Sequence, residues 1–141
     1  MSMMCMAKLI LSNKTDHREH RIYVPVVFLY ISAKGGDYMA TFSGIKHTTI
    51  GIQNEILPEM QIILWNMIDE NINKGLQMDY LQIFDLKATH ENGELEQKII
   101  HQQEQPRRKN TVTVNSSNPV YAKIFVIDDI SYVTMLLNHE Y

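Results

Sequence analysis

A histidine and three carboxylates have the residue types of a metal-dependent hydrolase. His101 and Glu104 form an H-x-x-E pair, and Asp128 and Asp129 are adjacent further along the chain. Metal ligands with H-x-x-E spacing share one face of a helix, but this pair falls at the end of an expected strand, where positions i and i+3 point to opposite faces. Adjacent aspartates are common in tight turns. The pattern therefore favours an exposed histidine, a loop carboxylate and a turn over a metal site.

Three consecutive cations follow Pro106 in an expected loop over residues 105–110: Arg107, Arg108 and Lys109. Such a run could bind the phosphates of a nucleic acid or a nucleotide. It could equally be a charged loop that keeps a sheet edge soluble. Residues 39–141 carry eight basic and 13 acidic residues, a net charge of −5, so binding of nucleic acid would need a segregated basic patch. Nucleic-acid or nucleotide binding is therefore the second hypothesis.

The remaining catalytic patterns are missing from the sequence. No serine lies in a G-x-S-x-G context, and no glycine pair has the spacing of a phosphate-binding loop. The single cysteine, Cys5, excludes a disulfide framework and is typical of a reducing compartment. No apolar run approaches the roughly 20 residues that span a bilayer. We therefore expect a cytoplasmic protein that is not an enzyme and has no catalytic residue, metal or cofactor.

Alternating apolar residues predict the strands that must position these groups. They lie at residues 46–53, 79–88, 94–102, 111–114, 121–127 and 132–137. The 121–127 segment is the best candidate for a central strand, since it is rich in β-branched and aromatic residues. Asn92 and Gly93 predict a hairpin, because both residues tolerate positive φ. We expect a mostly antiparallel sheet of about five strands.

One amphipathic helix is predicted to pack on this sheet. Pro58 suits a first helical turn, and Lys74 and Gly75 suit the end of the helix. Between them, apolar side chains follow the i, i+3, i+4, i+7 spacing of a helix face: Met60, Ile63, Leu64, Met67, Ile68 and Ile72. With one helix on one face of the sheet, the fold class is α+β.

The other face of the sheet then needs solvent, a partner or an upstream segment. Phe84, Leu86 and Ile100 are too apolar for a fully solvated face, so a homodimer or a partner protein would cover them. Trp65 would anchor an interface if it is partly exposed, and tyrosines on an open face could stack bases. The candidate partner-binding residues are Trp65, Tyr80, Phe84, Tyr121 and Tyr132.

Residues 1–38 differ in character from the rest of the chain. Residues 34–39 read KGGDYM, which can be encoded by a purine-rich ribosome-binding sequence placed before an AUG codon. This favours Met39 as the natural start, with one domain over residues 39–141. The alternatives are an extra edge strand formed by the apolar stretch at residues 22–31, a poorly ordered tail, and a secretory signal without a typical cleavage site.

Several strings occur in one order along the chain: LPEMQ at 57–61, LWNMID at 64–69, DYLQIF at 79–84, QKIIH at 97–101 and VIDD at 126–129. Together they resemble the staphylococcal-type domain of unknown function 960, a small Firmicutes family found on phages and mobile elements, over about residues 45–141. Members begin near Met39 and usually carry a basic residue where this chain has Thr48 and Thr49. The resemblance implies a fold and a genetic setting but no activity.

The first hypothesis is therefore a small interaction module of a phage or mobile element. It would bind a protein partner, or a second copy of itself, through a partly apolar sheet or helix face around Trp65. The third hypothesis is a metal-dependent hydrolase built from His101, Glu104 and Asp128 or Asp129. It ranks last, because the spacing of these residues does not match that of a metal site.

Overall fold

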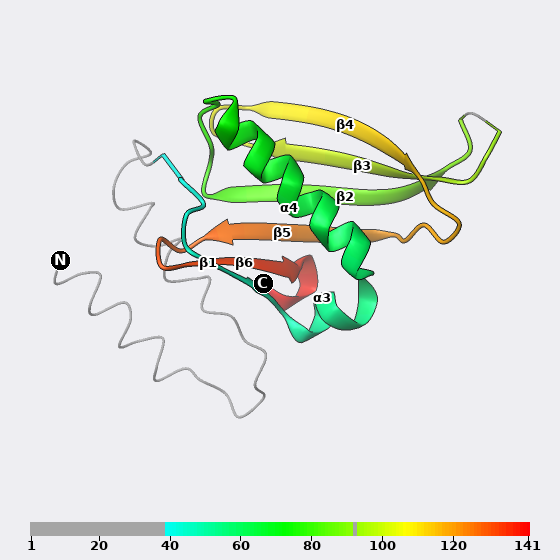
Figure 1. Ribbon diagram of the computed structural model, residues 1–141, viewed down its shortest axis with the longest axis horizontal. Helices are drawn as coiled ribbons and strands as arrows, with labels where there is room; N and C mark the ends of the chain where they lie inside the picture. Colours follow the sequence, from blue (N-terminus) through cyan, green and yellow to red (C-terminus); the bar gives the residue numbers. More distant parts are fainter. Residues whose placement is uncertain (1–38, 92) are drawn as a thin grey trace, which may run out of the picture.

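The computed structural model describes residues 39–91 and 93–141, which form a six-stranded sheet with two α-helices (Figure 1). The elements follow in the order β1 (Ile45–Thr48), α3 (Ile50–Glu55), α4 (Pro58–Asn73), β2 (Leu81–Thr89), β3 (Glu96–Gln103), β4 (Arg108–Asn115), β5 (Ala122–Asp128), β6 (Tyr132–Leu137) and the 3₁₀-helix η1 (Asn138–Glu140).

The strands lie side by side in the order β1-β6-β5-β2-β3-β4. All neighbours are antiparallel except β1, which runs parallel to β6. The predicted α+β class is confirmed, but the sheet is mixed and has six strands rather than about five. Strand β5 lies inside the sheet between β6 and β2, as its composition indicated.

The strand expected over residues 46–53 is wrong in its second half, which forms α3. Thr49 caps this helix, because its Oγ1 accepts a hydrogen bond from the Ile52 N–H at 3.1 Å. Ile52 and Ile56 are both buried and lie one helical turn apart. The alternation of Thr48, Ile50 and Ile52 had suggested a strand, but Ile50 is exposed.

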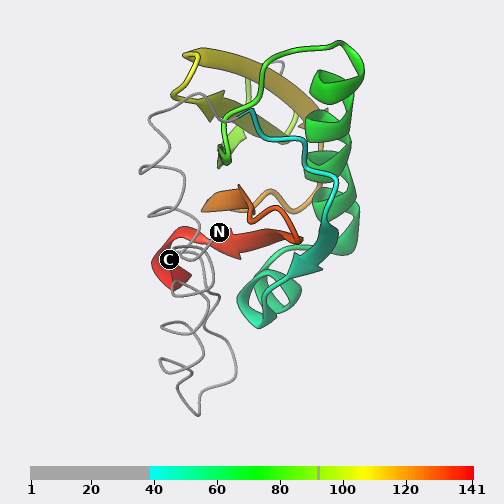
Figure 2. The same cartoon turned by 90° about the vertical axis from the view of Figure 1, so that its left-hand side faces the viewer.

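Helix α4 covers one face of the sheet (Figure 2). It begins at Pro58 as predicted, and Gly75, with φ +72°, follows its last turn. The core lies between α4 and the sheet. Its largest fully buried side chains on this side include Leu64, Ile68, Phe84, Leu86, Ile99, Ile124 and Met135.

Phe84 and Leu86 face α4 and are only 0% and 1% exposed, so the expectation that they lie on the uncovered face is wrong. They share this side of β2 with Gln82, whereas the opposite side of the sheet carries Ile83, Ile100 and other partly buried side chains. A smaller apolar cluster on that opposite side is formed by Ile127 and Leu136, with Tyr80, Leu81 and Phe125 packed against them.

Two carboxylates attach the ends of the described chain to the fold. Asp128 Oδ2 accepts from the Thr41 N–H at 3.1 Å and the Phe42 N–H at 3.0 Å, which holds the segment before β1 against the core. Glu140 Oε2 accepts from Thr49 Oγ1 at 2.7 Å and from the Leu137 N–H at 2.8 Å. These contacts tie β5, α3 and η1 to their neighbours.

The expected start at Met39 concerns residues 1–38, which lie outside the described residues, as does the stretch at 22–31. None of the described helices combines the length and the apolar character needed to cross a membrane.

Candidate functional site

Strand β4 forms one margin of the sheet and pairs only with β3 among the described residues (Figure 1). The orientation of its backbone follows from one contact, because the Asp128 N–H donates to the Tyr80 carbonyl at 2.9 Å and hydrogen-bonded pairs alternate in antiparallel sheets. We follow this alternation through the registers of β5 with β2, β2 with β3, and β3 with β4. Four residues then direct their N–H and C=O groups away from β3: Lys109, Thr111, Thr113 and Asn115.

Beyond Lys109, this edge lacks the features that usually prevent another strand from pairing. Sheet edges are commonly protected by proline, inward-pointing charge or bulges. Between Asn110 and Asn115 the strand has no proline, glycine or charged residue, and its centre alternates Thr and Val. All the positive charge lies at the start of the strand and in the turn before it. The edge is therefore open to strand addition.

A groove of about 150 Å³ lies between the start of α4 and the end of β4. Leu57, Met60 and Ile63 line it from the helix side, and Val114 lines it from the strand. Leu57 is 54% exposed, so the groove offers apolar surface to solvent. Side chains of a strand added beside β4 would reach this surface.

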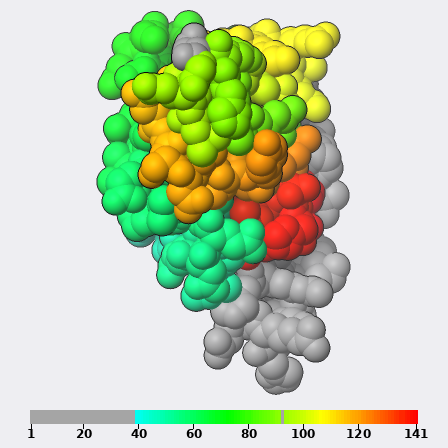
Figure 3. All heavy atoms as spheres, turned by 90° about the vertical axis from the view of Figure 1, so that its right-hand side faces the viewer, coloured from blue at the N-terminus to red at the C-terminus, as the bar shows by residue number. Residues whose placement is uncertain are grey.

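Gln97 fixes the wall of this groove. Its side-chain amide donates to the Val120 carbonyl at 3.0 Å, and its Oε1 accepts from the Val120 N–H at 2.7 Å. Figure 3 shows the segment that joins β4 to β5 packed against the β2–β3 hairpin at this end of the molecule. The buried amide of Gln97 thus replaces a backbone partner for an irregular segment.

The basic run does not form one loop patch, which corrects the loop expected over residues 105–110. Gln103 pairs with Arg108, so β4 begins there, and Arg108 and Lys109 point to opposite faces of the sheet. Arg108 Nη2 donates to the Gln77 carbonyl at 2.9 Å, and its Nη1 lies 3.5 Å from Gln103 Oε1. Arg108 therefore holds the segment before β2 in place.

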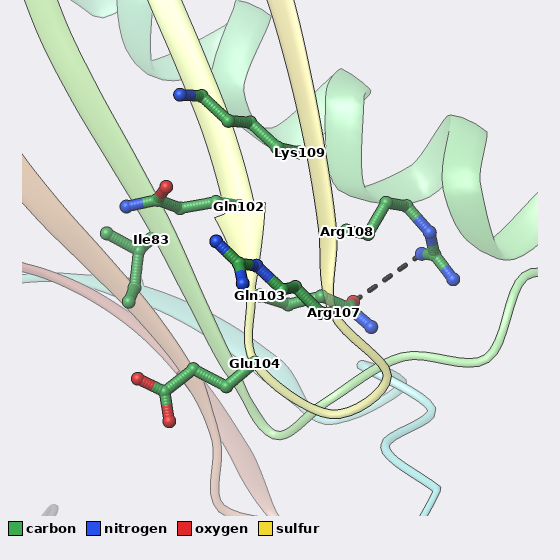
Figure 4. A pocket seen from close by; sticks show the side chains of 7 residues that line it. All are labelled: Ile83, Gln102, Gln103, Glu104, Arg107, Arg108 and Lys109. Atoms are coloured by element: carbon green, nitrogen blue, oxygen red, sulfur yellow. Dashed lines mark hydrogen bonds between the residues drawn. The ribbon is translucent and has the colours of Figure 1, made fainter.

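Arg107 and Lys109 line a pocket of about 410 Å³ on the side of the sheet away from α4 (Figure 4). Ile83 and Gln102 also line the pocket, and the Glu104 carboxylate reaches the same side. Neither Arg107 nor Lys109 forms an ion pair with a described residue. The pocket thus offers two cations to an anionic group.

A buried polar network lies between α4 and the same end of the sheet. Gln82 donates from Nε2 to Gln103 Oε1 at 3.1 Å and to the Asp79 carbonyl, so its Oε1 accepts from His101 Nε2 at 2.7 Å. Burial, and then the charge of Arg108, lowers the pKa of His101 to about 4. The expectation that His101 is exposed is wrong, because α4 covers the end of β3 where this side chain lies.

His101, Glu104 and Asp128 do not converge. His101 is buried in the network, Glu104 is exposed beyond the end of β3, and Asp128 binds backbone N–H groups near β1. The described residues contain no group of three His, Cys, Asp or Glu side chains arranged to hold a metal.

The five candidate partner-binding aromatics lie in different parts of the molecule. Trp65 is half-buried on α4, with Lys46 Nζ 5.2 Å from its ring centroid, and Phe84 is fully buried. Tyr80 belongs to the smaller cluster, where burial raises the pKa of its hydroxyl. Tyr121 and Tyr132 are exposed, but they lie at opposite ends of β5. These residues therefore do not form one binding surface.

The open edge of β4 was missed by sequence reasoning. The alternation of Thr and Val over residues 111–114 predicted a strand, but nothing in it showed that the strand would lie at a margin. Lys109 directly follows Arg108 in the basic run, but successive residues of a strand face opposite sides. A longer strand prediction would have separated the two cations.

A model of the family described as staphylococcal protein of unknown function (DUF960) matches residues 46–140. Among solved structures, the chain is similar to a protein of unknown function from Enterococcus faecalis, with 24% sequence identity and a TM-score of 0.61. That match covers 74% of this chain and 98% of the other, and at this identity it shows the fold alone. No protein of curated function matches the chain.

Proposed function

The chain belongs to the family of staphylococcal proteins of unknown function (DUF960), and we propose that it is a cytoplasmic, non-enzymatic module that binds an extended polypeptide along the edge of β4. The family resemblance implies a setting on a phage or mobile element. The polypeptide would be a segment of a partner protein or of a second copy of this chain.

The observation that supports this function is the outward direction of four backbone N–H and C=O pairs beside an apolar groove. A strand added to a sheet edge gains affinity from main-chain hydrogen bonds and specificity from pockets for alternate side chains. Both features occur here within the length of one strand. The scattered aromatic residues offer no comparable continuous surface.

The test is a proline substitution that blocks the edge. Thr113→Pro removes an outward N–H, and it should abolish any self-association seen by light scattering and any binding of extended eight-residue peptides seen by NMR. Lys87→Gln is the matched control, because Lys87 lies in β2, which β3 separates from the edge strand. A chain that stays monomeric and whose β4 amides respond to no peptide at millimolar concentration would contradict the proposal.

A second candidate is the binding of a small anion in the pocket lined by Arg107 and Lys109. Two cations without a described ion-pair partner at one pocket favour it. Titration with inorganic phosphate should shift the amides of the turn before β4, and Arg107→Gln with Lys109→Gln should remove the shift. An identical response in the double variant, or none at low salt, rules this candidate out.

A further inference from the structure

The register of β4 fixes what an added antiparallel strand would present to each face. Hydrogen-bonded pairs would form at the outward residues, which include Lys109, Thr111 and Thr113. Residues opposite Val112 and Val114 would lie in non-hydrogen-bonded pairs, with Cα atoms about 4.5 Å apart and side chains on the α4 side. The partner's positions are therefore distinguishable by face.

The positions opposite Val112 and Val114 favour apolar residues. Val112 and Val114 pack against the main core, and Val114 also lines the groove with Leu57 and Met60. A side chain placed opposite Val114 would cover this apolar surface, whereas a charged one would lose solvation there. The end of β4 therefore selects apolar residues on alternate positions of the partner.

The positions opposite Lys109 and Arg107 favour acidic residues. Lys109 lies on the other face of β4 and Arg107 in the turn just before the strand; both line the pocket shown in Figure 4, and neither is ion-paired with a described residue. Opposite charges directly across a strand pair attract. Residues 39–141 carry a net charge of −5, and at this end of β4 two cations outnumber the one carboxylate, that of Glu104, at the same pocket.

We infer that β4 selects an antiparallel strand of the pattern apolar-x-apolar-x-x-acidic-x-acidic. The first residue lies opposite Val114, the third opposite Val112, the sixth opposite Lys109 and the eighth opposite Arg107. The inference rests on the proposed function and specifies its partner. The acidic residues lie at the C-terminal end of the partner strand, beside the start of β4, because the two strands run in opposite directions.

A second copy of this chain fits the edge less well. The residues that follow Val112 are neutral from Thr113 to Val120, so an antiparallel β4 from another copy would place no carboxylate opposite Lys109. Both cations would remain unpaired in such a dimer. Charge complementarity therefore favours a different polypeptide with an acidic end.

The probe is the peptide acetyl-Val-Thr-Val-Thr-Gln-Glu-Thr-Asp-amide, titrated against the full chain at low salt. We expect shifts in the outward amides of β4 and an affinity roughly fivefold higher than that of the same peptide with Gln and Asn in place of Glu and Asp. Arg107→Gln with Lys109→Gln should make the two affinities equal. Lys87→Gln with Lys123→Gln should leave the difference between the two peptide affinities unchanged. These lysines lie on the same face of the sheet as Lys109, but in β2 and β5, away from the edge strand.

The other outcomes separate this inference from the proposed function. Equal binding of the two peptides, lost in Thr113→Pro and in Thr111→Pro, would overturn the charge rule and leave edge binding intact. Tighter binding of the reversed sequence would overturn the antiparallel direction. A dimer that dissociates in either proline variant would show that a second copy of the chain occupies the edge. A chain that stays monomeric and binds neither peptide would refute both proposals.

Discussion

The chemistry of His101 is governed by its position between α4 and the sheet. Its ring stacks on Phe84 with the centroids 4.2 Å apart, and its Nε2–H donates to Gln82. A charged imidazole in this place would lose its hydration without an adjacent carboxylate partner, and Arg108 would repel it. The residue type suggests acid–base chemistry, but the surroundings make His101 a neutral part of the core.

We expect His101 to make stability depend on pH. In the unfolded chain the imidazole gains a proton as pH falls through about 6.5, whereas in the folded chain its pKa is about 4. The unfolded state therefore binds more protons in this window, and the free energy of unfolding falls as pH drops from about 6.5 to about 4, by up to roughly 3 kcal/mol.

The control is His101→Gln, whose amide can still donate to Gln82 but does not titrate. Urea unfolding of both proteins at about pH 7, 5.5 and 4 gives their free energies of unfolding. As pH falls, the free energy of unfolding should decrease more for the unmodified protein than for the variant. A folded-state NMR titration of His101 near its ordinary pKa would show that the cause is wrong.

The polar residues of β3 show why burial could not be predicted residue by residue. Gln97, His101 and Gln103 lie in a strand whose apolar residues are Ile99 and Ile100 alone, a pattern that resembles a solvated strand. All three are buried, because α4 and the chain around it cover that face and each side chain finds a hydrogen-bond partner. Three of the partners, Gln77, Gln82 and Val120, come from segments remote in sequence, which no local pattern reveals.

Elements with a strong period were predicted close to their observed bounds. Helix α4 and strand β6 begin where proline and alternation placed them. The boundary between β1 and α3 was missed, because Ile52 fits both a two-residue and a four-residue spacing. Strand order was also beyond local reasoning, since the parallel pairing of β1 with β6 depends on where the rest of the chain brings them.

Two proline variants test the assigned direction of the β4 backbone. Thr113→Pro loses an N–H that points outward, so we expect a cost below about 1 kcal/mol. Val112→Pro loses an N–H that is directed toward β3, and should cost roughly 3 kcal/mol or more. Free energies of unfolding from urea titration decide between them, and equal costs would mean that the alternation has been assigned wrongly.

Gly51 is required where α3 meets η1. A Cβ at this position would lie 2.5 Å from Glu140 Oε1, and Glu140 is held by Thr49 and the Leu137 N–H. Gly51→Ala should therefore displace the carboxylate and destabilise the fold by about 1–2 kcal/mol, in spite of the better helix propensity of alanine.

The same substitution in a Glu140→Ala background should be neutral or stabilising, because the obstacle is gone and only the propensity remains. A double-mutant cycle by thermal or urea unfolding measures this coupling. Additive effects would show that Gly51 and Glu140 do not restrict each other.

At the scale of the whole molecule, two basic side chains lie at the start of the open sheet edge formed by β4. The described domain is acidic overall, yet its open margin begins with Arg107 and Lys109 and continues as a neutral strand. The net charge of the composition argues against nucleic-acid binding, but a net charge does not show that basic residues gather at one end of β4. Its position became informative only once β4 was placed at the margin of the sheet.

The extent of the folding unit can be tested at the segment before β1. The family match begins at residue 46, but Ala40 and Phe42 are buried in the core and are 3% and 4% exposed. A chain that begins at Ile45 would also lose the Thr41 and Phe42 N–H donors to Asp128 Oδ2. Because loss of one buried phenylalanine side chain typically costs 3–5 kcal/mol, we expect a chain of residues 45–141 to be at least about 3 kcal/mol less stable than residues 39–141.

Urea unfolding of the two chains measures the difference, and a chain of residues 40–141 is the control, because Met39 is 56% exposed and its removal should cost little. Equal stability of all three would mean that the segment before β1 does not belong to the core. A large loss of stability only when Ala40 and Phe42 are removed would place the start of the folding unit before the start of the family match. The physical reason is that the Asp128 carboxylate joins this segment to the turn between β5 and β6.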